Sequence, residues 1–144
     1  MIDIIGLLQV GSPFTLLSGA PPPMRDPILF TFGQLTVVNI QAVIGEDIYE
    51  PYVAEASVDV SDWDSWVIEA YVYDRSGTLR ATCKAATGTV VKTDVGQLYS
   101  WLKSAVTMAL PRGAYTIQTW RIDAGHEFVL RTGTLKLMPF APPV

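Results

Sequence analysis

The sequence predicts an all-β fold, an antiparallel β-sandwich of about seven or eight short strands with one short helical turn. Two observations lead to this prediction. Short apolar segments rich in β-branched residues recur from about Gln34 onward, and turn signals separate them roughly every eight to twelve residues. No internal repeat is visible. A chain of 144 residues suits one domain with a short extension, and such a domain can bury a sizeable core without disulfides or metals.

The first strands are predicted in the segments QLTVVNIQAVIG, at 34–45, and YVAEASVDVS, at 52–61. The first segment is rich in β-branched residues and ends at a glycine, as a buried strand does, whereas the second alternates imperfectly. The segment SWVIEAYVYD, at 65–74, is apolar on both faces, as expected between packed layers. One of its faces carries Trp66, Ile68, Ala70 and Val72.

Turn residues delimit the strands that follow. Asp74 is suited to cap a turn at DRSG, where Gly77 adopts a positive φ at low cost. The segments TLRATCKA and GTVVKTD are expected to form a hairpin around ATG. A strand to about Lys103 should then give way to one helical turn that ends near Pro111. The last two predicted strands, AYTIQTWRID and EFVLRTGTLKLM, are joined by DAGH.

Residues 1–33 differ in texture from residues 34–144, which make up the predicted sandwich domain. Four prolines crowd into SGAPPPMRDP, and such a stretch favours an extended conformation over a helix or a central strand. With apolar segments on both sides, this region is predicted to be an extended arm that lies on its own domain or on a neighbouring subunit. The residues expected to contact a partner are Ile4, Ile5, Leu7, Leu8, Phe14, Leu16, Leu17 and Trp63.

Charge and composition narrow the partners. The formal net charge is −4 and the ten Lys and Arg residues are scattered, so no nucleic-acid partner is expected. The apolar N-terminus lacks the basic region of a signal peptide and is interrupted by Asp3 and Gly6, so no membrane partner is expected. We expect a protein made and retained in a cytoplasm, or assembled into a particle there. With 49% apolar and 17% charged residues, either partner subunits cover apolar surface or the core is large.

The sequence offers poor material for catalysis. The single histidine, His126, neighbours Glu127 and lies near Asp123 at an expected hairpin tip, where side chains are usually solvated. No Gly-x-Ser-x-Gly elbow supplies a nucleophile and no phosphate-binding glycine loop is present. Cys83 is the only cysteine, so an intramolecular disulfide is impossible and a buried thiol is expected. We therefore expect a protein that is not an enzyme and that uses no cofactor or metal.

An acidic segment, DVSDWDSW, raises the question of a cation site. Aspartates at near spacing supply the hard oxygen ligands that calcium prefers. Counted from Asp59, however, loop positions six and twelve of an EF-hand fall on Asp64 and Ala70, so that pattern fails. The segment is interpreted as a solvated turn, with a structural cation as the alternative. Trp63 lies between Asp62 and Asp64 and is the tryptophan expected to be exposed.

Aromatic residues are the remaining candidates for binding. Trp66, Trp101 and Trp120 lie inside strand patterns, where packing in the core is the common role. The alternative is a ligand platform or a protein interface of the kind that sugar-binding sandwiches use. The full aromatic set is Trp63, Trp66, Tyr71, Tyr73, Tyr99, Trp101 and Trp120.

A series of turn and strand residues in the C-terminal half carries a family resemblance. The series is Leu110, Pro111, Gly113 and Tyr115, then Asp123 and Gly125, then Gly133, Leu135 and Leu137. Together with the upstream hairpin WVIEAYVYDRSGTLRATCKA, it resembles the immunoglobulin-like β-sandwich module of phage tail and baseplate proteins. It is most similar to the N-terminal domain of siphophage baseplate adaptors and to related modules of tail and head fibres. The resemblance covers about residues 35–138.

The resemblance implies an immunoglobulin-like sandwich acting as a non-enzymatic structural component of a phage virion, assembled in the host cytoplasm. A tail, baseplate or connector protein is the first expectation, and capsid decoration or head-fibre attachment is the alternative. Its partners would be other virion proteins and copies of itself. The adaptors continue into a long linker and further domains where this sequence stops at Val144, which favours a small connector. From another class, a carbohydrate-binding module would use Trp63 and neighbouring aromatics.

Overall fold

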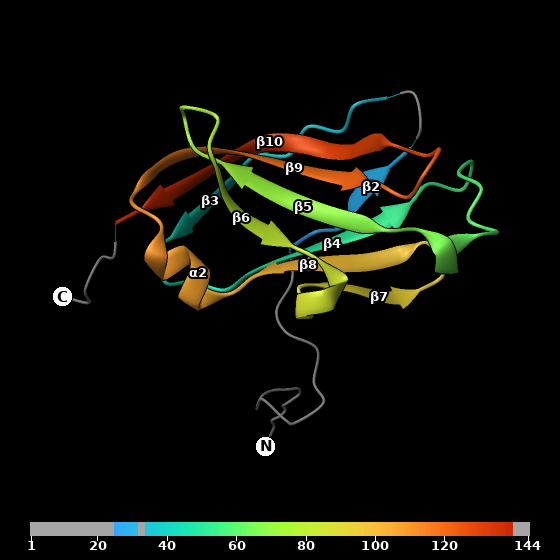
Figure 1. The fold of residues 1–144 in the computed structure, drawn as a ribbon, viewed down its shortest axis with the longest axis horizontal. Helices are drawn as coiled ribbons and strands as arrows, with labels where there is room; N and C mark the ends of the chain where they lie inside the picture. The colour runs from blue at the N-terminus through green and yellow to red at the C-terminus, as the bar shows by residue number, and fades with distance from the viewer. Residues whose placement is uncertain (1–24, 32–33, 140–144) are drawn as a thin grey trace, which may run out of the picture.

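The computed structural model describes residues 25–31 and 34–139. Two β-sheets lie one above the other in two layers, with a short helix at one end (Figure 1). The five-stranded sheet has the order β3-β10-β9-β5-β6 and the four-stranded sheet has the order β2-β4-β8-β7. The strands are β2 (Ile28–Phe30), β3 (Ile40–Val43), β4 (Ile48–Ala54), β5 (Ile68–Tyr73), β6 (Leu79–Cys83), β7 (Val90–Asp94), β8 (Gln97–Leu102), β9 (Gly113–Arg121) and β10 (Phe128–Met138). The all-β fold class is confirmed.

Both sheets are mixed, so the prediction of a wholly antiparallel fold is wrong. β3 pairs with β10 in parallel, Ile40 opposite Leu135, and β2 pairs with β4 in parallel, Ile28 opposite Tyr52. The nine strands of the described residues also exceed the predicted seven or eight. The apolar pattern of a strand does not record its direction or its partner, because side chains alternate in the same way in parallel and antiparallel pairs.

The predicted hairpin around ATG is also wrong. β6 lies in the five-stranded sheet and β7 in the four-stranded one, so this segment crosses between the layers. The crossing is made by the 3₁₀ helix η2 (Ala85–Thr87) and by Gly88, whose φ is 71°. Thr89 holds the corner, because its buried hydroxyl accepts a hydrogen bond from the Lys84 backbone N–H at 2.9 Å. β7 pairs instead with β8.

Other predicted elements are confirmed. Asp74 caps the β5–β6 turn and Gly77 has a φ of 86°. β8 ends at Leu102 and is followed by the helix α2 (Ser104–Ala109), and β9 and β10 form the last hairpin. The segments 34–45 and 52–61 are strands only in part, over β3 and the end of β4.

Residues 28–30 of the segment expected as an arm form β2 and pair with β4. Residues 1–24, and with them the seven apolar residues predicted to contact a partner, lie outside the described residues. The two sheets enclose one core, which includes the predicted face of β5. Its large members include Phe30, Tyr52, Trp63, Trp66, Ile68, Val72, Leu98, Ile117, Leu135 and Leu137.

Two residues of the family-like series have clear structural roles. A Cβ atom at Gly133 would lie 1.9 Å from the Val38 carbonyl oxygen, so only glycine lets the segment before β3 run beside β10. Tyr115 is 6% exposed, and its hydroxyl donates to the Pro111 carbonyl at the corner that opens β9. Gly133 is therefore a close-packing position and Tyr115 an anchor at a strand corner.

Candidate functional site

The interior between the sheets holds an ion pair. Glu50 of β4 and Arg131 of β10 are 2% and 0% exposed, and Nη2 of Arg131 donates to Oε2 of Glu50. Arg131 also donates to the Ile117 carbonyl at 3.2 Å. Burial raises the pKa of Glu50, and the facing guanidinium opposes that rise. Because the pair lies away from solvent and joins one sheet to the other, it is suited to fixing how the layers stack.

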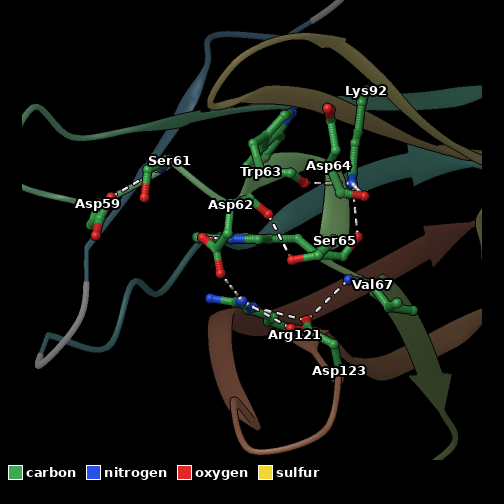
Figure 2. Close-up of polar contacts among 11 residues, drawn as sticks. Asp59, Ser61, Asp62, Trp63, Asp64, Ser65, Val67, Lys92, Arg121 and Asp123 are labelled. Atoms are coloured by element: carbon green, nitrogen blue, oxygen red, sulfur yellow. Dashed lines mark hydrogen bonds and ion pairs between the residues drawn. The ribbon is translucent and has the colours of Figure 1, made fainter.

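A second polar cluster lies at one end of the sandwich, around Arg121 (Figure 2). The guanidinium contacts Asp123 at 2.8 Å and Asp62 at 3.2 Å, and its central carbon lies 4.0 Å from the centroid of the Trp66 ring. Asp123 also accepts from the Val67 backbone N–H at 3.0 Å. Hydrogen bonds from Arg121 lower the pKa of Asp123 to about 2. The cluster fastens the acidic turn to the end of β9.

Lys92 of β7 fastens the same turn from the other sheet. Its ammonium donates to the carbonyl of Trp63 at 2.7 Å and to that of Trp66 at 2.8 Å, the first residue and the C-cap of the 3₁₀ helix η1 (Trp63–Ser65). Burial lowers the pKa of Lys92. The two cations at this end are thus engaged with the protein itself (Figure 2).

The acidic segment is a turn, as interpreted from the sequence, and its carboxylates do not converge. Asp59 accepts from the Ser61 backbone N–H at 2.9 Å, and Asp62 accepts from the Trp66 indole N–H at 2.9 Å. Across residues 25–31 and 34–139, no group of three or more metal-ligating side chains has a geometry that could hold an ion.

The expected exposure of Trp63 is wrong, since its side chain is 4% exposed. η1 turns the ring inward against Trp66, with centroids 4.9 Å apart. Flanking aspartates indicate that Trp63 is exposed only if the segment is extended. Here the 3₁₀ turn points the Trp63 ring into the core instead. The assignment of Trp63 as a partner contact stays a prediction.

His126 lies exposed at the tip of the β9–β10 hairpin, as predicted. Its neighbour Asp123 is engaged with Arg121 and not with the imidazole. Cys83 is buried, as expected, and burial raises the pKa of its thiol to about 12.

Trp101 and Trp120 lie on the outer faces of the sheets, so the expectation that they belong to the core is wrong. Along β8, Leu98, Ser100 and Leu102 are buried, which places the half-buried Trp101 on the outer side. Its ring stacks on Tyr49 with centroids 5.2 Å apart. Strand periodicity separates two faces but does not say which face is inside when both are apolar.

Apolar side chains lie on the outer side of all four strands of the four-stranded sheet, and the polar Gln97 and Asp94 lie at one end of that side. Leu29 is 54% exposed and lies opposite Val53 in register, and Tyr99 lies opposite both Pro51 and Val91. We call this surface the apolar sheet face. It consists of Leu29, Tyr49, Pro51, Val53, Val91, Tyr99 and Trp101. Sequence reasoning offered an interface as an alternative only for Tyr99 and Trp101, and it singled out none of the aliphatic members of this face.

Comparisons with known proteins add little to this geometry. No protein-family model matches the chain, and no curated protein does. Among solved structures, CopC from Methylosinus trichosporium OB3b is 10% identical, with a TM-score of 0.43 over 74% of this chain and 89% of that one. The N-terminal domain of phage TP901-1 ORF48 is 9% identical, with a TM-score of 0.46 over 77% of this chain and 95% of that one. Both TM-scores are under 0.5, so neither likeness bears on function.

Within the part of the chain that the structure describes, no helix is long and apolar enough to cross a membrane.

Proposed function

We propose that the protein is a non-enzymatic structural component of a phage virion, an immunoglobulin-like module of the tail, baseplate or a connector that works by subunit assembly. The observation that carries the proposal is the apolar sheet face. A contiguous apolar surface of this kind marks a contact with another protein more often than it marks free surface. The family resemblance in the C-terminal half supplies the virion context.

Tyr115 supports the immunoglobulin-like part of the proposal. A tyrosine at the start of a late strand, bonded through its hydroxyl to a backbone carbonyl a few residues upstream, is a hallmark of such sandwiches. Here that carbonyl belongs to Pro111. The parallel edge strands β2 and β3 are additions to that plan.

The N-terminal segment is the natural occupant of the apolar sheet face on a neighbouring subunit. It carries Ile4, Ile5, Leu7, Leu8, Phe14, Leu16 and Leu17. It joins the domain through β2, the edge strand that contributes Leu29 to that face. Fully extended, the 24 residues before Arg25 span up to about 80 Å, which is enough to reach a second copy. Capsid decoration or head-fibre attachment would use the same contacts at another place in the particle.

The test is proteomic and mutational. Washed, gradient-purified particles of the encoding phage should contain the chain in a fixed stoichiometry. A Leu29→Ser/Val53→Thr variant should be depleted from them, while Val67→Thr, which alters an exposed valine outside the face, should be incorporated normally. Absence of the wild-type chain from washed particles would refute the virion role.

One observation favours a second candidate, glycan binding, at a site other than Trp63. Tyr71, Tyr73 and Trp120 lie half-buried on the outer side of the five-stranded sheet, beside the polar groups of Glu69 and Gln118. Aromatic faces beside hydrogen-bonding groups suit sugars. Tryptophan fluorescence of the wild type, but not of Trp120→Phe, should then respond to a glycan panel; an unresponsive wild type would remove this candidate.

A further inference from the structure

A groove with an excess of positive charge lies at the end of the sandwich away from Arg121. It has a volume of about 620 Å³ and is formed by the β5–β6 turn, the corner that opens β9 and one residue of β10. Four of the ten Lys and Arg residues of the chain line it, with a single carboxylate, Asp74. We call it the basic groove, and its cations are Arg75, Arg80, Arg112 and Lys136.

The charge of the groove is left uncompensated by its own residues. Asp74 pairs with Arg80 at 3.2 Å and accepts from the backbone N–H groups of Ser76 and Thr78. The Ser76 hydroxyl also donates to Asp74. This hydrogen bond, followed by those of the backbone, lowers the pKa of Asp74 to about 2. The ion pairs found within the described residues involve none of the other three groove cations. All four cations are exposed, so they face solvent in a protein whose net charge is −4.

The opposite end of the sandwich is acidic. Strand β5 starts with Ile68 opposite Arg121 and ends with Tyr73 opposite Thr116. The turn that begins at Asp74 lines the groove, so η1 and the groove lie at opposite ends of this strand. Figure 1 shows β5 running from one end of the sandwich to the other. The cations at the η1 end, Arg121 and Lys92, are engaged internally. The acidic end therefore presents exposed carboxylates without exposed compensating cations. They are Glu55, Asp59, Asp64, Asp94 and Glu127, with the half-exposed Asp62 already paired to Arg121.

The surface of the acidic end is hollowed. Residues 60–65 and Val95 surround a shallow hollow of about 380 Å³, with Asp62 and Asp64 in its wall. A hollow with carboxylates can receive an arginine-bearing turn such as that at Arg75. Complementary potentials steer association and fix its orientation more than they add affinity.

We propose that the acidic end of one copy docks into the basic groove of the next, giving a head-to-tail contact. This inference rests on the proposed assembly function and specifies the partner as a second copy. Because the two surfaces differ, the contact is heterologous, and repetition builds a closed ring or an open filament. A second copy fits better than a nucleic acid, since the overall negative charge and the acidic end repel phosphates.

Two charge-reversed variants test the proposal by sedimentation velocity of the full chain at low salt. Arg112→Glu/Lys136→Glu reverses two charges of the basic groove and keeps the acidic end intact. Asp64→Lys/Glu127→Lys reverses two charges of the acidic end and keeps the basic groove intact. Wild type should show an association that disappears above about 0.5 M salt, where screening is short-ranged. Each variant alone should self-associate with an affinity lower by about tenfold or more. An equimolar mixture of the two variants should form a 1:1 dimer and no longer assembly. The intact acidic end of the first variant can dock into the intact groove of the second, and no second intact contact remains.

A matched control is Arg25→Glu/Lys84→Glu, which makes the same change in net charge at exposed positions outside the groove; it should associate like wild type. The proposal is overturned if both charge-reversed variants keep the salt-sensitive association, or if an equimolar mixture of the two forms no dimer. It is also overturned if the groove of the wild-type protein binds an oligoglutamate probe while that mixture stays monomeric. Salt-insensitive association in both variants with no gain on mixing would overturn the head-to-tail contact and leave assembly through the apolar sheet face standing.

Discussion

The core ion pair and the basic groove both place an arginine beside a carboxylate, yet their surroundings differ completely. The side chains of Arg131 and Glu50 are 0% and 3% exposed. Those of Arg80 and Asp74 are 37% and 22% exposed. A buried pair cannot lose one partner without leaving a charge in a poor solvent, whereas water stabilises an exposed pair almost as well as the partner does. The first pair therefore acts on stability and the second is available to another molecule.

The largest effect is expected from breaking the core pair on one side. Arg131→Met leaves the Glu50 carboxylate buried without its partner, so the free energy of unfolding should fall by about 3–5 kcal/mol. Urea denaturation followed by tryptophan fluorescence measures it. The control is Glu50→Gln/Arg131→Met, which removes both charges and should recover most of the loss. A single variant as stable as the double one would contradict the assigned role.

A smaller loss is expected at the acidic end. Asp123→Asn removes the charge that faces Arg121, whose side chain is 3% exposed, and weakens the bond to the Val67 backbone N–H. Stability should fall by about 1–3 kcal/mol, as judged by the same denaturation. Glu127→Gln, four residues on and exposed, is the matched control and should behave as wild type.

The same carboxylate should make the free energy of unfolding fall at acidic pH. The pKa of Asp123 is lowered from 3.8 to about 2, so its contribution is complete above about pH 4 and is lost as the pH falls toward 2. The stability of the wild type should decline over that range more steeply than that of Asp123→Asn. Parallel pH curves for the two proteins would show that Asp123 does not contribute in this way.

The smallest effect on folding is expected in the groove. Arg80→Gln breaks an exposed pair, so thermal unfolding should be unchanged within error. The salt-sensitive association should nevertheless weaken, since one of four groove cations is gone. A clear drop in the melting temperature would mean that the groove pair is structural, and the contrast with the core pair would fail.

Much of the fold follows from the sequence, but its long-range pairings do not. The buried face formed by Trp66 and, in β5, by Ile68, Ala70 and Val72 was predictable, as was the turn at Asp74, because periodicity and turn chemistry are local. The crossing at Gly88 was not, since a glycine turn joins two strands of one sheet or of two sheets equally well. Parallel β2 and β3 depend on partners far along the chain.

The functional surfaces were harder to predict than the fold. Trp63 was expected to be exposed and is buried, whereas Trp101 was expected in the core and lies half-buried on the outer side of its sheet, because only the packed layers decide which apolar face meets solvent. The basic groove was invisible for another reason. Its cations come from 75–80, 112 and 136, and only the fold gathers them, so a search for charge runs along the chain finds nothing.

We propose above all that the protein works by assembling, through the apolar sheet face and the charged ends. Sedimentation equilibrium of the full chain over a range of concentrations tests it most directly. The account predicts a weight-average mass that rises above the monomer mass of 15.8 kDa as concentration increases, and more steeply at low salt. A mass that stays at 15.8 kDa at every concentration and salt would contradict it.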